Sequence, residues 1–168
     1  MYIRKTEAAD IPAVLSIYKN ARSFMRRNGN GTQWSEDYPG EVSLRADMEK
    51  KCSYVCCTDK SEVCASFYFA REIEPSYAFI RGAWLNDEPY GLVHRIACCE
   101  SGRGIGSFCL QYCLSEAENI RIDTHKDNLP MRSLLKKLNF VYCGIVLLSD
   151  GSERLAFQKR LFKKAVTS

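Results

Sequence analysis

The chain has 168 residues, of which 46% are hydrophobic and 26% charged, and its formal net charge is +4 at pH 7. These values are ordinary for a globular protein with a full hydrophobic core, and no apolar run is long enough to cross a membrane. We therefore expect one domain over residues 1–168 and no membrane partner. The N-terminal residues 1–6 lack the apolar stretch of a signal peptide, so we expect a cytoplasmic location.

Basic residues and cysteines narrow the function classes further. Arg22, Arg26 and Arg27 fall on adjacent turns of a predicted helix and indicate a solvated basic face. No zinc-finger, basic-zipper or aromatic RNA-binding pattern accompanies them, so nucleic acid is not an expected partner. The nine cysteines are an odd number in a chain of this length, which favours free thiols over a disulfide framework. Without a C-x-x-C pattern, and with two histidines only, no metal site is expected.

The first half of the chain predicts strands around two helices. The first helix can be capped by Thr6 or Asp10, tolerates Pro12 in its first turn, and ends at an Asn-Gly-Asn-Gly run. A later four-residue polar turn predicts a hairpin, and one more strand continues that meander. The expected ranges are a strand at 2–4, a helix ending at 28–31, a helix at 41–51, strands at 53–58 and 63–71 around the turn 59–62, and a strand near 77–82.

The second half predicts strands alternating with helices. Asn128 and Pro130 mark a helix start, and Asn139 stands where a left-handed cap is expected. Asp150-Gly151 is a strong hairpin turn. The expected ranges are strands at 91–98, 119–124, 140–148 and 153–161, and helices after the glycines near 104 and over 129–138.

A glycine loop lies where a strand gives way to a helix. It reads Gly102-Arg103-Gly104-Ile105-Gly106-Ser107, and the apolar residues after it follow helical spacing: Ile105, Phe108, Cys109, Tyr112 and Cys113. Such a loop leaves backbone N–H groups free, and the helix N-terminus adds partial positive charge in the same place. The stretch therefore predicts a phosphate or pyrophosphate site.

Three kinds of glycine loop are compared with this stretch. The P-loop pattern is absent from the chain. The dinucleotide fingerprint needs G-x-G-x-x-G early in the chain, whereas this loop reads G-x-G-x-G far from the N-terminus, with Asp123 as weak support for a ribose contact. The third kind binds the pyrophosphate of coenzyme A while the pantetheine arm pairs with the preceding strand.

The chain resembles the GNAT acetyltransferase superfamily in two motifs and in the order of its elements. Ser101-Gly102-Arg103-Gly104-Ile105-Gly106 resembles the family's [QR]-x-x-G-x-[GA] loop. The run from Asn128 to Phe140 resembles the family's N-x-x-[AM]-x-x-L-[YL]-x-K-x-G-F helix. Ser101 stands where the family usually has Arg or Gln, and Arg103 can compensate. Leu135 stands where many members have a tyrosine that protonates the leaving thiolate.

The resemblance implies an α/β (α+β) fold with a mixed, mostly antiparallel sheet of six to seven strands. It implies helices on both faces and a splayed parallel strand pair at the acyl-CoA site. It also implies that acetyl-CoA donates its acetyl group directly to a primary amine, with no metal and no covalent enzyme intermediate. The resemblance implies that the backbone N–H of Ile96 or Ala97 bonds the thioester carbonyl of acetyl-CoA. The residues that it implies for binding acetyl-CoA are Ile96, Ala97, Cys98, Ser101, Gly102, Arg103, Gly104, Ile105, Gly106, Ser107, Asn128 and Met131.

Several groups are candidates for the general base. His125 ends a central strand beside the Asn128 helix, and its side chain titrates in the right range, although a histidine that merely caps the strand is the alternative. His94 is on the neighbouring strand, where a packed histidine is the alternative. Glu72 and Glu74 can act through water or remain solvated carboxylates. Tyr142 can replace the missing acid or pack in the core.

The acceptor pocket is expected from the loop after the first helix and from His94. Met25, Gln33, Trp34 and Tyr38 are unusually amphipathic for a loop, although packing alone also explains Trp34. We expect a small-molecule or peptide amine as the acceptor, and exposed strand edges permit a homodimer. Two other function classes are weighed: an acyl-CoA-binding sensor on the same fold, and a nucleotide-binding oxidoreductase, which the glycine spacing disfavours.

Overall fold

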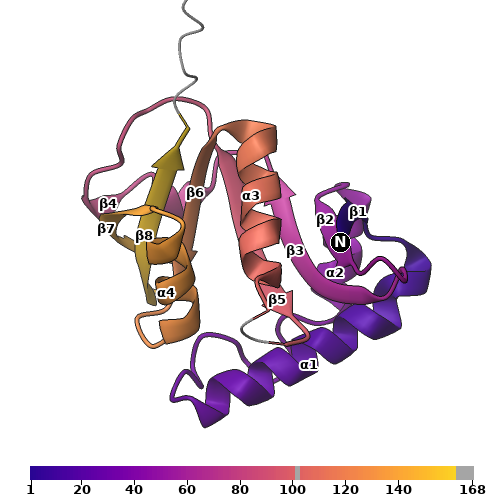
Figure 1. Ribbon diagram of the computed structural model, residues 1–168. Helices are drawn as coiled ribbons and strands as arrows, with labels where there is room; N and C mark the ends of the chain where they lie inside the picture. Colours follow the sequence, from indigo (N-terminus) through magenta and orange to yellow (C-terminus); the bar gives the residue numbers. More distant parts are fainter. Residues whose placement is uncertain (101–102, 162–168) are drawn as a thin grey trace, which may run out of the picture.

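The computed structural model describes residues 1–100 and 103–161. Its described strands form one eight-stranded sheet in the order β1-β2-β3-β5-β6-β8-β7-β4, in which β5 and β6 are parallel and all other neighbours are antiparallel (Figure 1). The mixed, mostly antiparallel fold expected from the sequence is confirmed, with eight strands in the sheet instead of six to seven. The strands are β1 (Tyr2–Lys5), β2 (Ser53–Cys57), β3 (Val63–Ala70), β4 (Ile80–Gly82), β5 (Gly91–Cys98), β6 (Asn119–Thr124), β7 (Val141–Leu147) and β8 (Glu153–Arg160).

The pairing of the edge strand β4, which forms within the range expected near residues 77–82, corrects one sequence prediction. This strand does not continue the β2–β3 meander but pairs with β7 at the opposite edge of the sheet. The 3-10 turn η2 (Pro75–Tyr77) precedes β4. Gly82 allows the pairing, because a Cβ at that position would lie 2.1 Å from the Cys143 carbonyl oxygen. The two backbones therefore approach more closely than a side chain permits.

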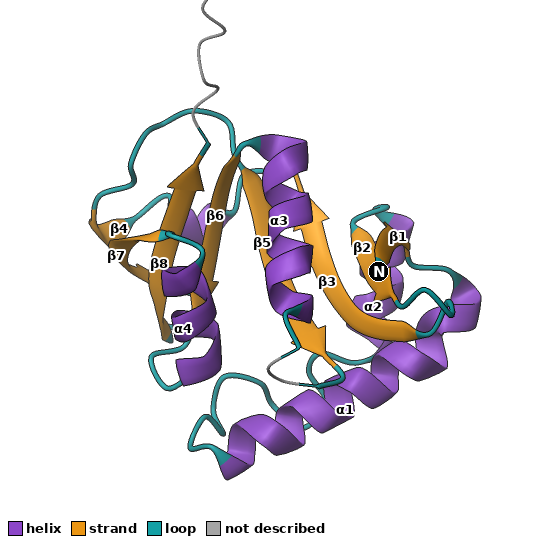
Figure 2. Ribbon diagram, in the orientation of Figure 1, coloured by secondary structure: helices purple, strands orange, loops and turns teal. Residues whose placement is uncertain are grey.

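Helices cover both faces of the sheet, as Figure 2 shows. Alternate residues of β2 separate the two layers, because successive strand side chains point to opposite faces. Cys56 packs in the cluster that contains α3 and α4, whereas Val55 and Cys57 pack with α1 and α2. The helices are α1 (Ile11–Arg27), which follows the 3-10 turn η1 (Ala8–Asp10), α2 (Glu41–Glu49), α3 (Ile105–Ala117) and α4 (Leu129–Lys137).

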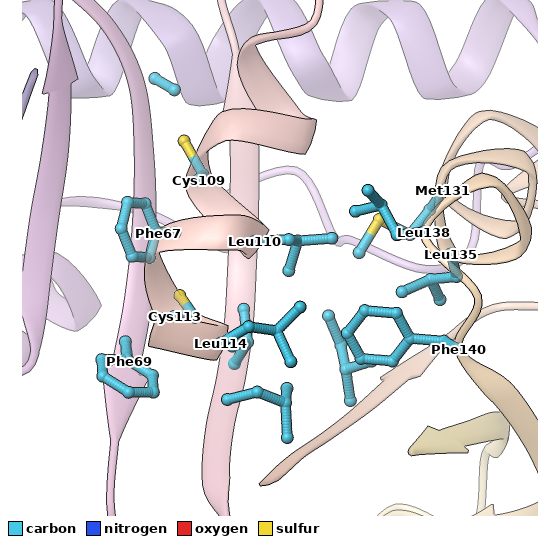
Figure 3. Packing of buried hydrophobic residues seen from close by; sticks show 14 of the residues in the cluster. Phe67, Phe69, Cys109, Leu110, Cys113, Leu114, Met131, Leu135, Leu138 and Phe140 are labelled. Atoms are coloured by element: carbon cyan, nitrogen blue, oxygen red, sulfur yellow. The ribbon is translucent and has the colours of Figure 1, made fainter. Parts of the chain in front are cut away.

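The buried face of α3 is wider than the sequence pattern predicts. Cys109 and Cys113 are buried as expected, but Leu110 and Leu114 are buried as well, whereas Phe108 and Tyr112 are only partly covered. Figure 3 shows the reason, since Leu110 points toward the α4 side chains around Leu135 while the cysteines face the sheet. A helix packed against both a sheet and a second helix has two covered flanks.

The central strand pair separates part of the way along its length. β5 and β6 pair only from Gly91 to Val93, opposite Ile120–Ile122, although β5 continues to Cys98 and β6 to Thr124. Arg95 has a left-handed backbone at φ 52°, and the β3–β5 register shifts at this point. An irregularity of this kind bends the strand. The bend lies where β5 leaves β6, and the candidate site opens there.

Candidate functional site

A cleft of about 1180 Å³ lies where β5 and β6 separate. Its walls come from both halves of the chain: the C-terminal part of α1 and the loop after it, the second half of β5, the start of α3, the end of β6, and α4. Many of the residues expected from the sequence line it, among them Met25, Gln33, Trp34, Tyr38, Glu74, His94, Ile96, Ala97, Cys98, Gly104, Asn128 and Met131. Ile105, Gly106 and Ser107 line it too.

The start of α3 forms one end of the cleft. Gly104 is the N-cap in a left-handed conformation, at φ 76°, and the first intrahelical bond runs from the Phe108 N–H to the Gly104 carbonyl oxygen at 3.0 Å. The N–H groups of residues 105–107 therefore have no carbonyl acceptor within the helix. Predicted residues Ser101 and Gly102 lie outside the described residues. The Arg103 side chain is 73% exposed and pairs with Glu100 at 2.5 Å.

Gly106 brings the glycine loop and α4 close together. A Cβ on Gly106 would lie 2.9 Å from Leu134 Cδ2 and 3.8 Å from Cys98 Sγ. The lack of a side chain at Gly106 lets the first α3 turn pack closely against α4, and the space beside Gly104, where a Cβ would meet nothing within 4 Å, stays open to a ligand. Backbone donors, helix polarity and close access fit the pyrophosphate of a coenzyme A molecule.

The separated part of β5 offers backbone donors of its own. The Cys99 N–H donates to the Cys64 carbonyl oxygen at 2.9 Å, toward β3. N–H directions alternate along a strand, so the Cys98 N–H points to the side that β6 has left. Ile96, two residues earlier, lies next to the bulge and lines the same cleft. This is the place where an added extended segment can pair with the strand.

Asn128 joins α4 to the loop after α1. Its Oδ1 accepts from the Met131 N–H at 3.2 Å, and its Nδ2 donates to Gln33 Oε1 at 2.9 Å. Asn30 Nδ2 also donates to Gln33 Oε1, at 2.8 Å. The side chain predicted to bond a pantetheine arm is thus engaged in a helix cap and a loop contact, and in this arrangement it positions the cleft wall.

The aromatic residues of the loop both pack and line the cleft. Trp34 is 8% exposed and meets Tyr18 edge-on, with ring centroids 6.1 Å apart. The Tyr38 hydroxyl accepts from Arg95 Nη1 at 3.0 Å. Trp34 therefore packs in the core and also borders the cleft.

His94 lies between two carboxylates inside the cleft. Its Nε2 is 3.4 Å from Glu74 Oε2, and its Nδ1 is 3.6 Å from Asp123 Oδ2. Tyr77 donates its hydroxyl to Asp123 at 2.8 Å. The hydrogen bond from His94 and those from Ser76 lower the pKa of Glu74 to about 2, against the opposing effect of burial. Glu74 is therefore a poor proton acceptor and a good partner for the imidazole.

The other candidate bases occupy different places. His125 Nδ1 is 3.4 Å from Asp127 Oδ2 and its Nε2 is 3.4 Å from Thr32 Oγ1. Burial, and then the positive charge of Arg154, lower the pKa of His125. Among the described residues, those that line the cleft do not include His125. Nor do they include Glu72, which accepts a hydrogen bond from Tyr68, or Tyr142, which is 53% exposed.

Two arginines of the cleft were missed by the sequence interpretation. Arg95 donates to both oxygens of Asp47, at 3.1 and 2.8 Å, and its guanidinium lies over the Tyr68 ring. Arg154 on β8 lines the far wall of the cleft. Two consecutive polar residues, His94 and Arg95, break the apolar strand pattern and were a usable signal. Nothing near Arg154 in the sequence points to the site.

The structure also bears on membranes and metals. Within residues 1–100 and 103–161, no helix combines the length and the apolar character that a bilayer span requires. In the same ranges, no group of three or more histidine, cysteine, aspartate or glutamate side chains is arranged to hold a metal ion.

Comparison with known proteins supports one fold family. A GNAT family acetyltransferase from Streptococcus agalactiae is 31% identical in sequence, with a TM-score of 0.88 over 96% of both chains. A GNAT family acetyltransferase from Listeria monocytogenes is 15% identical, with a TM-score of 0.70, over 95% of this chain and 94% of the other. A phosphinothricin acetyltransferase of the GNAT superfamily from Sinorhizobium meliloti, in complex with AcCoA, is 16% identical, with a TM-score of 0.64 over 99% of this chain and 91% of the other. No family model and no curated protein matches the sequence.

Proposed function

The chain belongs to the GNAT family of acetyltransferases, and on that premise we propose that it transfers an acetyl group from acetyl-CoA directly to an amine. One observation carries the proposal: a single cleft runs from the open N–H groups of the first α3 turn, along the separated part of β5, to His94. The two ends of an acetyl-CoA molecule bound along this cleft would meet different groups. The phosphates would meet backbone donors, and the thioester would lie near a histidine.

The donor half of the site is made largely of main chain. The N–H groups of residues 105–107 would hold the pyrophosphate, helped by the helix polarity. The Ile96 or Cys98 N–H would pair with the pantetheine arm or bond the thioester oxygen, where negative charge develops during the reaction. Lys137 at the end of α4 also lines the cleft and would attract a further phosphate.

We assign the general base to His94 rather than to His125. The acceptor must lose a proton, because an ammonium has no lone pair for attack. The neutral amine then attacks the thioester carbon, a C–N bond forms, the C–S bond breaks, and the second proton of the nitrogen passes to the departing coenzyme A thiolate. His94 takes the amine proton, and the adjacent Glu74 and Asp123 carboxylates stabilise the imidazolium that results. Their distances of 3.4 and 3.6 Å from the ring suit that role.

A non-catalytic sensor of acyl-CoA is the second candidate, and it rests on Leu135. This residue stands where many family members have an acidic tyrosine, and here it is fully buried against α3. Leu135 therefore supplies no proton to a leaving thiolate. A sensor would keep the donor half of the cleft and lack turnover.

The proposal is tested in two steps with the full chain. The first step is a thermal-shift comparison of acetyl-CoA, NAD and ATP, because a ligand that binds the folded state raises its apparent stability. We expect a shift with acetyl-CoA only. The second step is release of free thiol from acetyl-CoA in the presence of an amine library. Thiol release with some amines supports the transferase, while binding without release for any amine supports the sensor.

A further inference from the structure

Arg154 is a buried cation at the acceptor end of the cleft. It lies on β8 opposite Val146 of β7, its side chain is 8% exposed, and it lines the cleft wall. It comes within reach of the site because β6 and β8 pair side by side, with Asp123 opposite Ala156. Burial of a guanidinium is costly unless charged or polar partners surround it.

The hydrogen bonds of Arg154 leave part of its guanidinium free for a ligand. Nη1 donates to Ser152 Oγ at 3.1 Å and to the Glu153 carbonyl oxygen at 3.0 Å. Nε is 4.0 Å from Asp123 Oδ1, beyond hydrogen-bond distance. Within the described part of the chain, Nε and Nη2 make no hydrogen bond. The planar fork of an arginine is suited to carboxylate oxygens.

Asp123 connects this free guanidinium edge to the proposed base. One of its oxygens faces Arg154, and the other is 3.6 Å from His94 Nδ1 and accepts from Tyr77. A ligand group bound to Arg154 would therefore lie one side chain away from His94. The Glu74 and Asp123 carboxylates around His94 would repel an anion and attract an ammonium there. The acceptor end of the cleft thus has a cationic subsite at Arg154 and, close to it, an anionic subsite at Glu74 and Asp123.

We propose that the acceptor is a compact amino acid, with a primary amine directed to His94 and a carboxylate bound by Arg154. This inference rests on the proposed acetyltransferase function and narrows its substrate class. Arg154 is then a specificity-determining residue that contacts the acceptor. The carboxylate would accept hydrogen bonds from the Nε–Nη2 edge, which the 4.0 Å ion pair with Asp123 leaves without a hydrogen bond among the described residues. Because Asp123 contacts both Arg154 and His94, few bonds should separate the amine from the carboxylate.

The test uses matched acceptors with acetyl-CoA as the donor. L-amino acids are compared with their carboxamides and with the corresponding decarboxylated amines, and kcat/KM is measured by thiol release. We expect amino acids to be preferred by on the order of 30-fold or more, which is typical for loss of one partner from a buried charge pair. Equal kcat/KM for an amino acid and its decarboxylated amine would overturn the inference.

Variants of Arg154 separate recognition from folding. Arg154→Gln should remove the preference for amino acids, and Arg154→Lys should restore part of it, because lysine keeps the charge and loses the fork. Arg160→Gln on the same strand is the matched control, since Arg160 pairs with Glu88 and Glu118 instead. Acetyl-CoA binding, measured by titration calorimetry, should not change in any of the three variants. An equal loss of kcat/KM for all acceptors in Arg154→Gln would count against a carboxylate subsite.

The acceptor class and the transferase activity itself can be distinguished by the same assays. If the wild-type protein acetylates amines without carboxylates as well as amino acids, the transferase stands and the acceptor class is wrong. If it binds acetyl-CoA and acetylates no member of the three matched sets, nor any amine of a wider library, the transferase itself is wrong.

Discussion

Glu74 Oε2 lies 3.4 Å from His94 Nε2, which joins the loop after β3 to the last residue of β5 before its bulge. The contact places a carboxylate that stays ionised beside an imidazole in the cleft wall. This is the arrangement in which a histidine accepts a proton and the resulting positive charge is stabilised.

Removal of the imidazole should slow turnover without loss of donor binding. His94→Gln is expected to lower kcat by about 10²- to 10⁴-fold, the usual contribution of a positioned general base. Steady-state kinetics with a saturating amine measures kcat, and calorimetry measures acetyl-CoA affinity, which should not change. His125→Gln is the comparison variant, because His125 is not among the described residues that line the cleft. A larger loss of kcat in His125→Gln than in His94→Gln would reverse the assignment of the base.

Glu74 should stabilise the fold in a pH-dependent way. Its pKa is lowered to about 2 by the hydrogen bonds from His94 and Ser76. The ionised form is therefore favoured in the folded state, so its stabilisation is complete above the ordinary glutamate pKa and is lost as pH falls toward 2. We expect Glu74→Gln to lower the free energy of unfolding by about 2 kcal/mol at pH 6 and by much less at pH 2.5. Denaturant titrations at both pH values measure this difference.

An exposed glutamate provides the control for that experiment. Glu62 lies in the β2–β3 turn, where its main chain bonds Thr58. Glu62→Gln should change the unfolding free energy little at either pH. If Glu74→Gln lowers the unfolding free energy as much at pH 2.5 as at pH 6, the ionised form of Glu74 is not what stabilises the fold.

The glycine loop can be tested with two glycines in the same backbone conformation. Gly104 has φ 76° and Gly151 has φ 79°, and a Cβ on either would meet nothing within 4 Å. Gly104→Ala and Gly151→Ala should each cost about 1 kcal/mol of stability, because alanine is strained at positive φ. Only Gly104→Ala should weaken acetyl-CoA binding, because Gly104 caps the helix end that meets the phosphates. Equal acetyl-CoA dissociation constants for the two variants would show that the loop does not contact the donor.

The ion pair between Arg95 and Asp47 should stabilise the folded protein. Burial raises the pKa of Asp47, and Arg95 opposes that effect. Arg95→Ala leaves the Asp47 carboxylate buried without its partner, so we expect a loss of about 3 kcal/mol of unfolding free energy. The double variant Arg95→Met with Asp47→Leu should recover much of that loss, because no buried charge remains. Thermal unfolding of both variants measures the effect, and a double variant less stable than Arg95→Ala would contradict it.

Local sequence patterns predict most of the elements. Asn128 caps α4 and Asn139 takes a left-handed conformation at φ 57°, as their side chains suggest. The pairing of β4 was not predictable in this way, because three residues carry no periodicity and a short strand can pair with any free edge. Its partner is set by the close approach of Gly82 to the Cys143 main chain, a contact between residues far apart in sequence.

The site was predictable only where a local motif forms it. The glycine loop and the amphipathic loop after α1 both carry local signals, and both line the cleft. The choice between His94 and His125 depends on the direction of a side chain beside the bulge at Arg95, and an irregular strand does not follow simple alternation. Arg154 reaches the cleft through the β6–β8 register, which no single segment specifies.

Product analysis by mass spectrometry follows acetyl transfer to the amine itself. The full-length protein is incubated with acetyl-CoA and an amine that supports thiol release, and both products are quantified. We expect one acetyl group on the amine nitrogen for each coenzyme A released, at a rate that falls at least 100-fold in His94→Gln. Thiol release without an acetylated amine, or acetylation by His94→Gln at the wild-type rate, would contradict this expectation.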